Sequence, residues 1–395
     1  MSQAKSQRSV VDLGTYSPGV TSVHRIPVSN THALRTAYVE TARLETLLNA
    51  SQSNVLGIVL YDRGPGEPRG LGACPVVSLD LSQFNEPLLA EVWTSPLPVT
   101  YDQAEGIQFA MNDEVLFGAL QLEERPGTPL DLVTYTAYRR LLVQARALGY
   151  PHLLRVWNYF PHINFESDGL TRYQRFCVGR HQALAEGLLD FPRTLPAGTA
   201  VGTTSGRLKI HFLAARQPGT HVENPRQVSA YEYPRVYGPR SPSFARATLR
   251  PSISGSHLLI AGTASVVGHV SEHIGEPYQQ TLEIIHNLDA LITHTEQLHG
   301  VTRGQWYGQA LLKIYIRHPE HFAMVSDILK EQLPSHIQVL YLQGEMCRRE
   351  LLLEIEGILG QEQSIDVSQS VSPTRVRLRQ PATSQHAQPD SFKTA

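Results

Sequence analysis

The hydrophobic residues of the chain recur at two spacings, and each spacing predicts one type of secondary structure. Apolar positions three and four residues apart are typical of amphipathic helices. This spacing predicts helices over residues 129–148, 171–189, 277–298 and 319–333. The first is followed by Gly149, Tyr150 and Pro151, which favour a helix end, and Thr171 is a candidate N-cap for the second. Long helices are therefore expected in both halves of the chain.

Short apolar or alternating runs between these helices predict strands. They lie at residues 54–61, 107–111, 115–122, 152–160, 207–215, 226–233, 257–267, 310–317, 337–342 and 351–358. The last two runs are expected to pair as a closing hairpin. Because helices follow strands and hairpins also occur, the pattern predicts an α+β fold in which mixed β-sheets pack against long helices, rather than a doubly wound sheet.

A stretch rich in Pro, Gly and Thr at residues 192–206 indicates a boundary between two domains. We expect a loose leader at 1–15, an N-terminal α+β domain at 16–195 and a C-terminal domain at 196–360. Residues 361–395 are rich in Ser, Gln, Pro and Thr, which predicts a disordered tail. No internal repeat is evident in the sequence.

Composition narrows the class of protein. The 395 residues are 41% hydrophobic and 18% charged, which is enough apolar material for a core and too little charge for a disordered chain. A net charge of -2 argues against a nucleic-acid or anionic membrane partner. The N-terminus is polar, and the three cysteines lie far apart without the spacing of a zinc site. We therefore expect a cytoplasmic globular protein that does not enter a membrane.

The most informative candidate site is a proline-broken loop in which arginine and tyrosine alternate. Its members are Arg226, Tyr231, Tyr233, Arg235, Tyr237, Arg240, Arg246 and Arg250. Guanidinium groups bind carboxylates through paired hydrogen bonds, and tyrosine adds an apolar wall with a polar tip. The loop suits a small cyclic dianion, although a solvated loop with unrelated arginines gives the same pattern.

The last predicted strand carries two carboxylates. Alternation with a period of two places Glu354 and Glu356 on one face, which Leu352 shares. Burial raises the pKa of a carboxyl group, so a buried member of this pair would donate a proton near neutrality. An ordinary half-exposed strand is the alternative interpretation.

Three further features are each open to a functional and a packing explanation. The small residues at 262–268 would let a ligand approach the backbone or would simply pack tightly. Cys347 precedes Arg348 and is either a thiolate favoured by positive charge or an ordinary core cysteine. His318 and His321 have a spacing compatible with zinc but no third ligand nearby in the sequence, so no metal site is predicted.

Two resemblances extend this interpretation. Residues 253–360 resemble the reactive-intermediate deaminase (Rid) superfamily through QQTLEIIHNLDALI, GQALLKIYIRHPEHFAMVSDIL, HIQVLYLQG and LLLEIEGIL. Residues 54–360 resemble the chorismatase family through RVWNYFPHIN, RYQRFCVGRHQAL, ENPRQVSAYEYPRVYGPRSPSFARA, GTASVVGH and CRRELLLEIEG. The resemblance implies a Rid-like C-terminal domain and a cofactor-free enzyme that removes pyruvate from chorismate.

The chorismatase resemblance also implies roles for individual residues. Chorismate is a dianion, and protonation of its enolpyruvyl methylene carbon gives an oxocarbenium ion that collapses to release pyruvate. The implied acid is Glu354, with Glu356 as the alternative. The implied substrate-binding residues are Arg240, Arg246 and Tyr237 around the carboxylates and Gly262, Thr263 and Ala264 beneath the ring.

The family divides by product, and Cys347 bears on that division. In the branch that resembles 3-hydroxybenzoate synthases, a cysteine shortly before the catalytic glutamate is associated with product choice, and Cys347 precedes Glu354 in a comparable place. This favours 3-hydroxybenzoate, with 4-hydroxybenzoate as a possible second product. The alternatives are a hydrolytic chorismatase giving a dihydroxycyclohexadiene carboxylate, a Rid-type imine deaminase and a non-catalytic metabolite-binding protein. Both a monomer and a trimer are compatible with the sequence.

Overall fold

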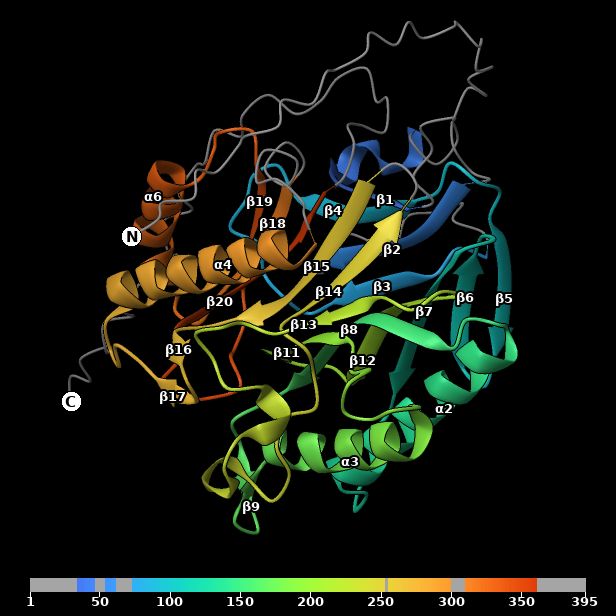
Figure 1. The fold of residues 1–395 in the computed structure, drawn as a ribbon, viewed down its shortest axis with the longest axis horizontal. Coiled ribbons are helices and arrows are strands. Elements are labelled where there is room, and N and C mark those ends of the chain that lie inside the picture. The colour runs from blue at the N-terminus through green and yellow to red at the C-terminus, as the bar shows by residue number, and fades with distance from the viewer. Residues whose placement is uncertain (1–33, 47–53, 62–72, 253–254, 300–309, 361–395) are drawn as a thin grey trace, which may run out of the picture. The chain divides into compact units, whose positions relative to one another are not determined.

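The computed structural model describes residues 34–46, 54–61, 73–252, 255–299 and 310–360 (Figure 1). These residues belong to one compact unit that begins at His32. The predicted leader and the predicted disordered tail both lie outside the described residues. No helix in the described ranges is long and apolar enough to cross a membrane.

The first sheet is formed by the N-terminal part of the chain. It has the strand order β1-β4-β2-β3. Its strands are β1 (Arg35–Glu40), β2 (Val55–Tyr61), β3 (Val76–Leu79) and β4 (Leu89–Thr94). A short 3-10 helix, η1 (Thr41–Arg43), follows β1. Among these strands the sequence predicted only β2, because the others lack a clear alternation.

The second sheet has six strands in the order β11-β8-β12-β7-β6-β5, with two long helices packed on it. The strands are β5 (Thr100–Ala104), β6 (Ile107–Met111), β7 (Val115–Leu122), β8 (His152–Pro161), β11 (Ala197–Thr203) and β12 (Leu208–Ala215). The helices are α2 (Leu130–Ala147) and α3 (Arg172–Gly187). Thr171 caps α3 in a reciprocal capping box with Gln174, which confirms the predicted N-cap.

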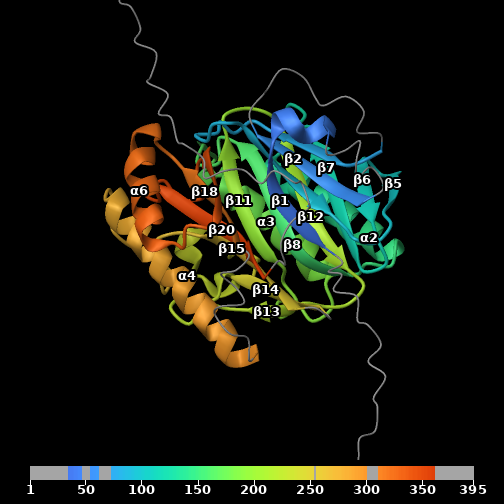
Figure 2. The ribbon, with the colours of Figure 1, turned by 90° about the horizontal axis from the view of Figure 1, so that it is seen from above.

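The third sheet also has six strands, in the order β13-β14-β15-β20-β18-β19. The strands are β13 (Thr220–Val222), β14 (Ala247–Ser252), β15 (Gly255–Thr263), β18 (Ala310–Ile316), β19 (Gln338–Gln343) and β20 (Leu353–Leu359). Its helices are α4 (Pro277–His299) and α6 (Phe322–Gln332), which lie together on one side of the sheet (Figures 1 and 2).

Short elements complete the description. Two small hairpins are formed by β9 (Glu166–Ser167) with β10 (Leu170–Thr171) and by β16 (Val266–Val267) with β17 (Val270–Ser271). The 3-10 turns are η3 (Ala230–Glu232), η4 (Arg235–Tyr237) and η5 (Pro319–His321).

The second and third sheets share one topology. In each, three consecutive strands are followed by a helix, a fourth strand, a second helix, a fifth strand and a sixth strand. The sixth strand pairs antiparallel between the third and the fourth, and the fourth pairs in parallel with the fifth. The sequence shows no such repeat because β12 (LKIHFLAA) and β20 (LEIEGIL) preserve a pattern of burial rather than the same residues.

Helices cover the outer faces of these two sheets, and the inner faces meet. The buried rings of Trp93, Phe117, Trp157 and Tyr315 come from β4, β7, β8 and β18 and belong to one hydrophobic cluster. Separate clusters lie between α2 and α3 and the second sheet, and between α4 and α6 and the third. The predicted α+β class, with mixed sheets packed against long helices, is confirmed.

Two predictions of local structure are wrong, and a third is correct only in part. Residues 337–342 and 351–358 do not form a hairpin, because β19 pairs in parallel with β18 while β20 lies between β15 and β18. All residues of β20 are buried, because α4 and α6 cover one face of the strand and the second sheet covers the other. Residues 226–233 form turns and η3 instead of a strand, and the predicted strand 257–267 divides into β15 and β16.

The predicted boundary between residues 195 and 196 falls between α3 and β11. Strands β11 and β12 join the second sheet, and the third sheet begins at β13. A division of the chain into two domains at this point stays a prediction.

Candidate active site

A cavity lies where the second and third sheets approach each other. Its lining comes from α3 and β11 of the second sheet region, from β15 and β20 of the third, and from the loops before β14 and β20. The lining residues are Tyr173, Arg180, Gly198, Ala200, Tyr233, Phe244, Arg246, Gly262, Ala264, Val266, Cys347, Arg348, Leu351 and Glu354. Three guanidinium groups and one carboxyl group therefore face the same space.

Glu354 is held as a buried acid on β20. Its side chain lies in the cavity wall with 5% of its surface exposed. Burial, together with the charge of Glu356, raises the pKa of Glu354 to about 8 against the opposing effects of Arg155 and Arg246. A carboxyl group with this pKa is protonated at neutral pH and is a proton donor.

Gly262 on β15 leaves the space that this carboxyl group occupies. A Cβ atom on residue 262 would lie 1.8 Å from Oε1 of Glu354, closer than any two such atoms can approach. The sequence predicted that a ligand approaches the backbone closely at this position. The structure adds a second reason for glycine here, because the carboxyl group of Glu354 also lies against the backbone.

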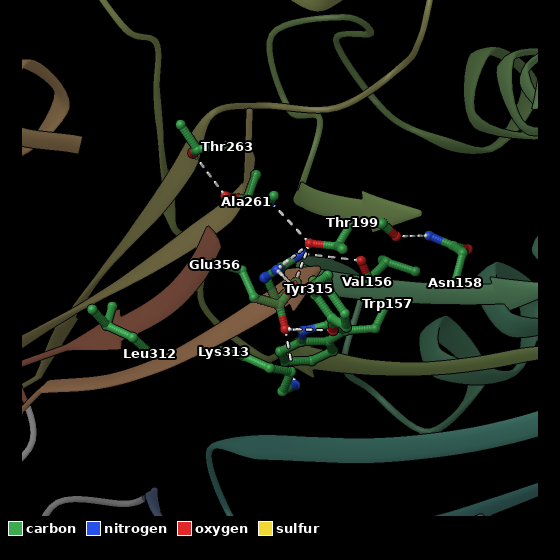
Figure 3. A network of polar contacts seen from close by, with 12 residues as sticks. Val156, Trp157, Asn158, Thr199, Ala261, Thr263, Leu312, Lys313, Tyr315 and Glu356 are labelled. Carbon is green, nitrogen blue, oxygen red and sulfur yellow. Dashed lines mark hydrogen bonds and ion pairs between the residues drawn. The ribbon is translucent and has the colours of Figure 1, made fainter. Parts of the chain in front are cut away.

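Glu356, two residues along the same strand, has a different environment (Figure 3). Its carboxylate accepts hydrogen bonds from the side chains of Arg155, Trp157, Thr199, Lys313 and Tyr315. Burial opposes ionisation, but Lys313 and Arg155 outweigh it and lower the pKa of Glu356. The face that both glutamates share therefore holds one neutral acid and one permanent anion.

Two buried arginines, one from α3 and one from the loop before β14, bring positive charge to the cavity. Arg246 donates from Nη2 to the carbonyl of Val228 at 3.1 Å and to the hydroxyl of Tyr233 at 2.6 Å. Arg180 projects from α3 and stacks over the ring of Phe176 at 4.7 Å. Among the described residues, Nε of each guanidinium has no hydrogen-bond partner. Unpaired buried donors of this kind are suited to binding an anion.

A third arginine, in the loop before β20, is fixed by the hairpin of β16 and β17. Arg348 donates from Nη1 to the carbonyl of His269 at 3.0 Å and to the hydroxyl of Ser271 at 2.9 Å. Its guanidinium lies over the ring of Tyr237 at 4.0 Å. The Tyr237 hydroxyl is itself hydrogen bonded to His269 at 3.2 Å, so Tyr237 supports Arg348 from outside the lining.

The other predicted site residues divide between the cavity and its surroundings. Gly262, Ala264 and Arg246 line the cavity as the resemblance implies. Thr263 points to the other face of β15, where its hydroxyl donates to the carbonyl of Ala261. Arg240 is exposed and lies outside the described lining, so of the two predicted carboxylate ligands only Arg246 faces the cavity.

Sequence reasoning missed the contribution of α3 and β11. Tyr173 and Arg180 lie seven positions apart on α3, on the helix face that buries Phe176 and Cys177. An arginine in the apolar stripe of an amphipathic helix is the signal that could have identified this wall. Gly198 and Ala200 of β11 carry no comparable signal.

Cys347 lines the cavity as a neutral thiol. Burial, reinforced by the nearby Glu354, raises the pKa of Cys347 to about 12. The interpretation of Cys347 as a thiolate favoured by the neighbouring arginines is therefore wrong, and an S–H group faces the cavity.

The histidine pair gains no third ligand. The rings of His318 and His321 lie 5.4 Å apart. Within the described ranges, no group of three or more histidine, cysteine or acidic side chains is arranged to hold a metal ion.

Comparison with known proteins identifies the family. Residues 91–214 match the model described as Chorismatase FkbO/Hyg5-like, N-terminal. A 3-hydroxybenzoate synthase from Streptomyces hygroscopicus is 32% identical over 334 residues, which cover 82% of this chain and 96% of that protein. A chorismatase from the same organism is 36% identical over 310 residues, covering 77% and 89%. A crystal structure of a chorismatase matches with a TM-score of 0.75 and 33% identity over 83% of this chain and 99% of that chain.

These matches define the chain as an enzyme of the kind that acts on chorismate. The chain belongs to the chorismatase family. The family resemblance given by the sequence motifs is thereby confirmed.

Proposed function

We propose that this protein converts chorismate to 3-hydroxybenzoate and pyruvate, with Glu354 as the general acid. The observation that carries the proposal is a carboxyl group with a pKa of about 8 in the wall of a cavity that is also lined by arginines. Membership of the chorismatase family and the similarity to a 3-hydroxybenzoate synthase supply the substrate and the product. A protein that only bound a metabolite would have no use for a carboxyl group kept protonated at a cost in stability.

The first step is proton transfer to carbon. The Glu354 O–H bond breaks as its proton bonds to the terminal methylene carbon of the enolpyruvyl group, and an ether lone pair forms the oxocarbenium ion. The arginines bind the two substrate carboxylates, and Glu354 becomes a carboxylate beside the developing cation. The oxygen of a neighbouring ring hydroxyl bonds to the cationic carbon, and its proton passes through the Glu354 carboxylate to the ether oxygen as the bond from that oxygen to the same carbon breaks. The bond between the ring and the newly bonded oxygen then breaks, which releases pyruvate and leaves a ring cation.

Aromatisation completes the reaction. The ring loses a proton as it becomes aromatic, and the Glu354 carboxylate accepts it and returns to the acid form. Hydroxybenzoate and pyruvate together contain all the atoms of chorismate, so no water is consumed. The hydrolytic branch differs in that water traps the ion, which gives a dihydroxycyclohexadiene acid.

A direct assay tests the proposal. Purified protein is incubated with chorismate, pyruvate is followed with lactate dehydrogenase, and the ring product is identified by chromatography. We expect equal amounts of pyruvate and hydroxybenzoate. Absence of pyruvate would refute the proposal, whereas pyruvate with a dihydrodiol would place the enzyme in the hydrolytic branch.

Arg246→Ala is expected to raise KM for chorismate about 10- to 100-fold, the range given by loss of one charge-assisted hydrogen bond to a carboxylate. Arg246 is 5% exposed and lines the cavity. Arg240→Ala is the matched comparison from the same loop, and its KM should equal that of the wild type because Arg240 is exposed. Steady-state kinetics measures both, and the reverse order of effects would overturn this assignment.

Cys347→Ala is expected to change the product ratio more than the rate of pyruvate release. The neutral thiol lines the cavity beside Glu354, where it can assist the rearrangement of the ring after pyruvate has left. Chromatography of the ring products from the variant and the wild type gives the ratio. Cys74→Ala, in a separate hydrophobic cluster, serves as the control, and an unchanged product profile in Cys347→Ala would contradict this role.

A further inference from the structure

Strand β15 contains an irregularity directly opposite Glu356 of β20. Ile260 pairs with Gly357 and Thr263 pairs with Ile355, so Ala261 and Gly262 together oppose the single residue Glu356. This is a β-bulge, which re-aims the local backbone and leaves it outside the regular ladder. Gly262, the residue against the Glu354 carboxyl group, is part of it.

The two amide groups of the bulge are bonded away from β20. The amide of Ala261 donates to the carbonyl of Arg246 at 2.9 Å. The amide of Gly262 donates to the side-chain hydroxyl of Thr199, on β11, at 2.9 Å. The bulge is therefore bonded to the main chain of Arg246, and it also lies against the side chain of Glu354. Both of these residues line the cavity.

The direction of the Thr199 hydroxyl is set by charge. Its proton is donated to Oε2 of Glu356, and Nη2 of Arg155 donates to its oxygen at 2.6 Å. Because Glu356 takes the only hydroxyl proton, the oxygen faces Gly262 as an acceptor. Figure 3 shows Thr199 between Glu356 and the part of β15 that carries Ala261 and Thr263.

We propose that Thr199 is a positioning residue, whose hydroxyl holds the β15 bulge against Glu354 and so fixes the acid for proton transfer to carbon. The inference rests on the role of Glu354 in the proposed function. Without the hydroxyl, the Gly262 amide is a buried donor with no partner, and the peptide must turn to find one. Gly262 then no longer restricts the position of the Glu354 carboxyl group. The hydrogen bond from the Ala261 amide to the Arg246 carbonyl is disturbed by the same movement.

The test compares Thr199→Val, Thr199→Ala and Thr199→Ser by steady-state pyruvate release. Valine removes the hydroxyl at nearly constant volume, alanine removes it without a buried branched group, and serine retains it. We expect kcat to fall about 10- to 100-fold in the valine and alanine variants, the scale of a misplaced reacting group, with little change in KM. Serine is expected to restore kcat to within a few-fold of the wild type.

Thr248→Val is the matched control for stability. Thr248 on β14 is also buried, and its hydroxyl also accepts a backbone amide, that of Ala197 at 3.0 Å. The Thr248→Val variant should lose about as much thermal stability as Thr199→Val but retain the kcat of the wild type. Wild-type kcat in either Thr199→Val or Thr199→Ala, or a loss in Thr199→Ser as large as theirs, would overturn the positioning role. If the wild type itself released no pyruvate, the proposed function would fail instead.

Discussion

Glu354→Gln is expected to lower kcat at least about 100-fold, the usual scale for loss of a general acid, and to raise the melting temperature. The amide keeps the shape of the side chain but cannot transfer a proton to carbon. Pyruvate release under saturating chorismate measures the loss. A variant with near wild-type kcat would show that another group is the acid.

The stability gain follows from the same pKa that makes the residue an acid. The carboxyl of Glu354 has a pKa of about 8 in the folded protein, against a reference value of 4.5. Between these values folding takes up a proton, so stability falls as pH rises from 4.5 to about 8 and then levels off. Glutamine takes up no proton, and the variant should be more stable at neutral pH by about 1–3 kcal/mol.

Two measurements check this linkage. The kcat of the wild type should fall as pH rises through about 8, because the acid form is lost there. Thermal melts across the same range should show a stability difference between Glu354→Gln and the wild type that grows as pH rises. Glu356→Gln is the contrasting variant, since it removes an anion that Lys313 and Arg155 need, and it should destabilise the protein. Equal effects of the two substitutions on stability would contradict the separate protonation states.

Lys313→Met is expected to lower the free energy of unfolding by about 3–5 kcal/mol, the cost of leaving buried charges unpaired. The Lys313 ammonium lies 2.7 Å from Oε2 of Glu91 and 2.9 Å from Oε1 of Glu356, and all three side chains are about 3% exposed. Without it, Glu356 retains Arg155 as a cationic partner, whereas Glu91 is left with the neutral donors Tyr61 and Trp93. Urea unfolding monitored by tryptophan fluorescence measures the change.

A surface lysine provides the comparison for this substitution. Lys330 pairs with Asp327 at 2.9 Å, but both side chains are more than half exposed. Lys330→Met should change stability by no more than about 1 kcal/mol. A similar small effect of Lys313→Met would mean that Glu91 or Glu356 takes up a proton easily in its place.

The sequence predicted the helices well and the pairing of strands poorly. The helices α2, α3 and α4 each have a complete apolar stripe with local start or stop signals, so their bounds follow from nearby residues. Strand β20 shows why pairing is harder, since its LEIEGIL pattern alternates as in a half-exposed hairpin strand. Its central position depends on β15 and β18, which are distant in the sequence.

The residues of the candidate site also differ in whether nearby sequence is enough to identify them. Glu354, Gly262 and Cys347 could be found from local pattern and family resemblance, because each lies in or beside a short motif that carries its chemistry. The arginine loop identified the right type of residue, but only the packed structure distinguishes the buried Arg246 from the exposed Arg240. Arg180 lies in the apolar stripe of α3, which is a local signal of burial, but the cavity that it lines forms only where the two sheets meet.

The shared topology of the second and third sheets has a consequence for how such a site can be assembled. Lys209 pairs with Tyr159 as Glu354 pairs with Tyr315, and the two tyrosine hydroxyls meet at 2.9 Å. Corresponding positions thus carry side chains of different chemistry, since the Lys209 ammonium bonds to the carbonyl of Ser78 whereas the Glu354 carboxyl group faces the cavity. Joining both copies in one polypeptide lets each contribute different side chains to one cavity, with Glu354, Arg246 and Arg348 from one copy and Tyr173 and Arg180 from the other. Severing the chain between the copies would leave each fragment with only part of the cavity wall.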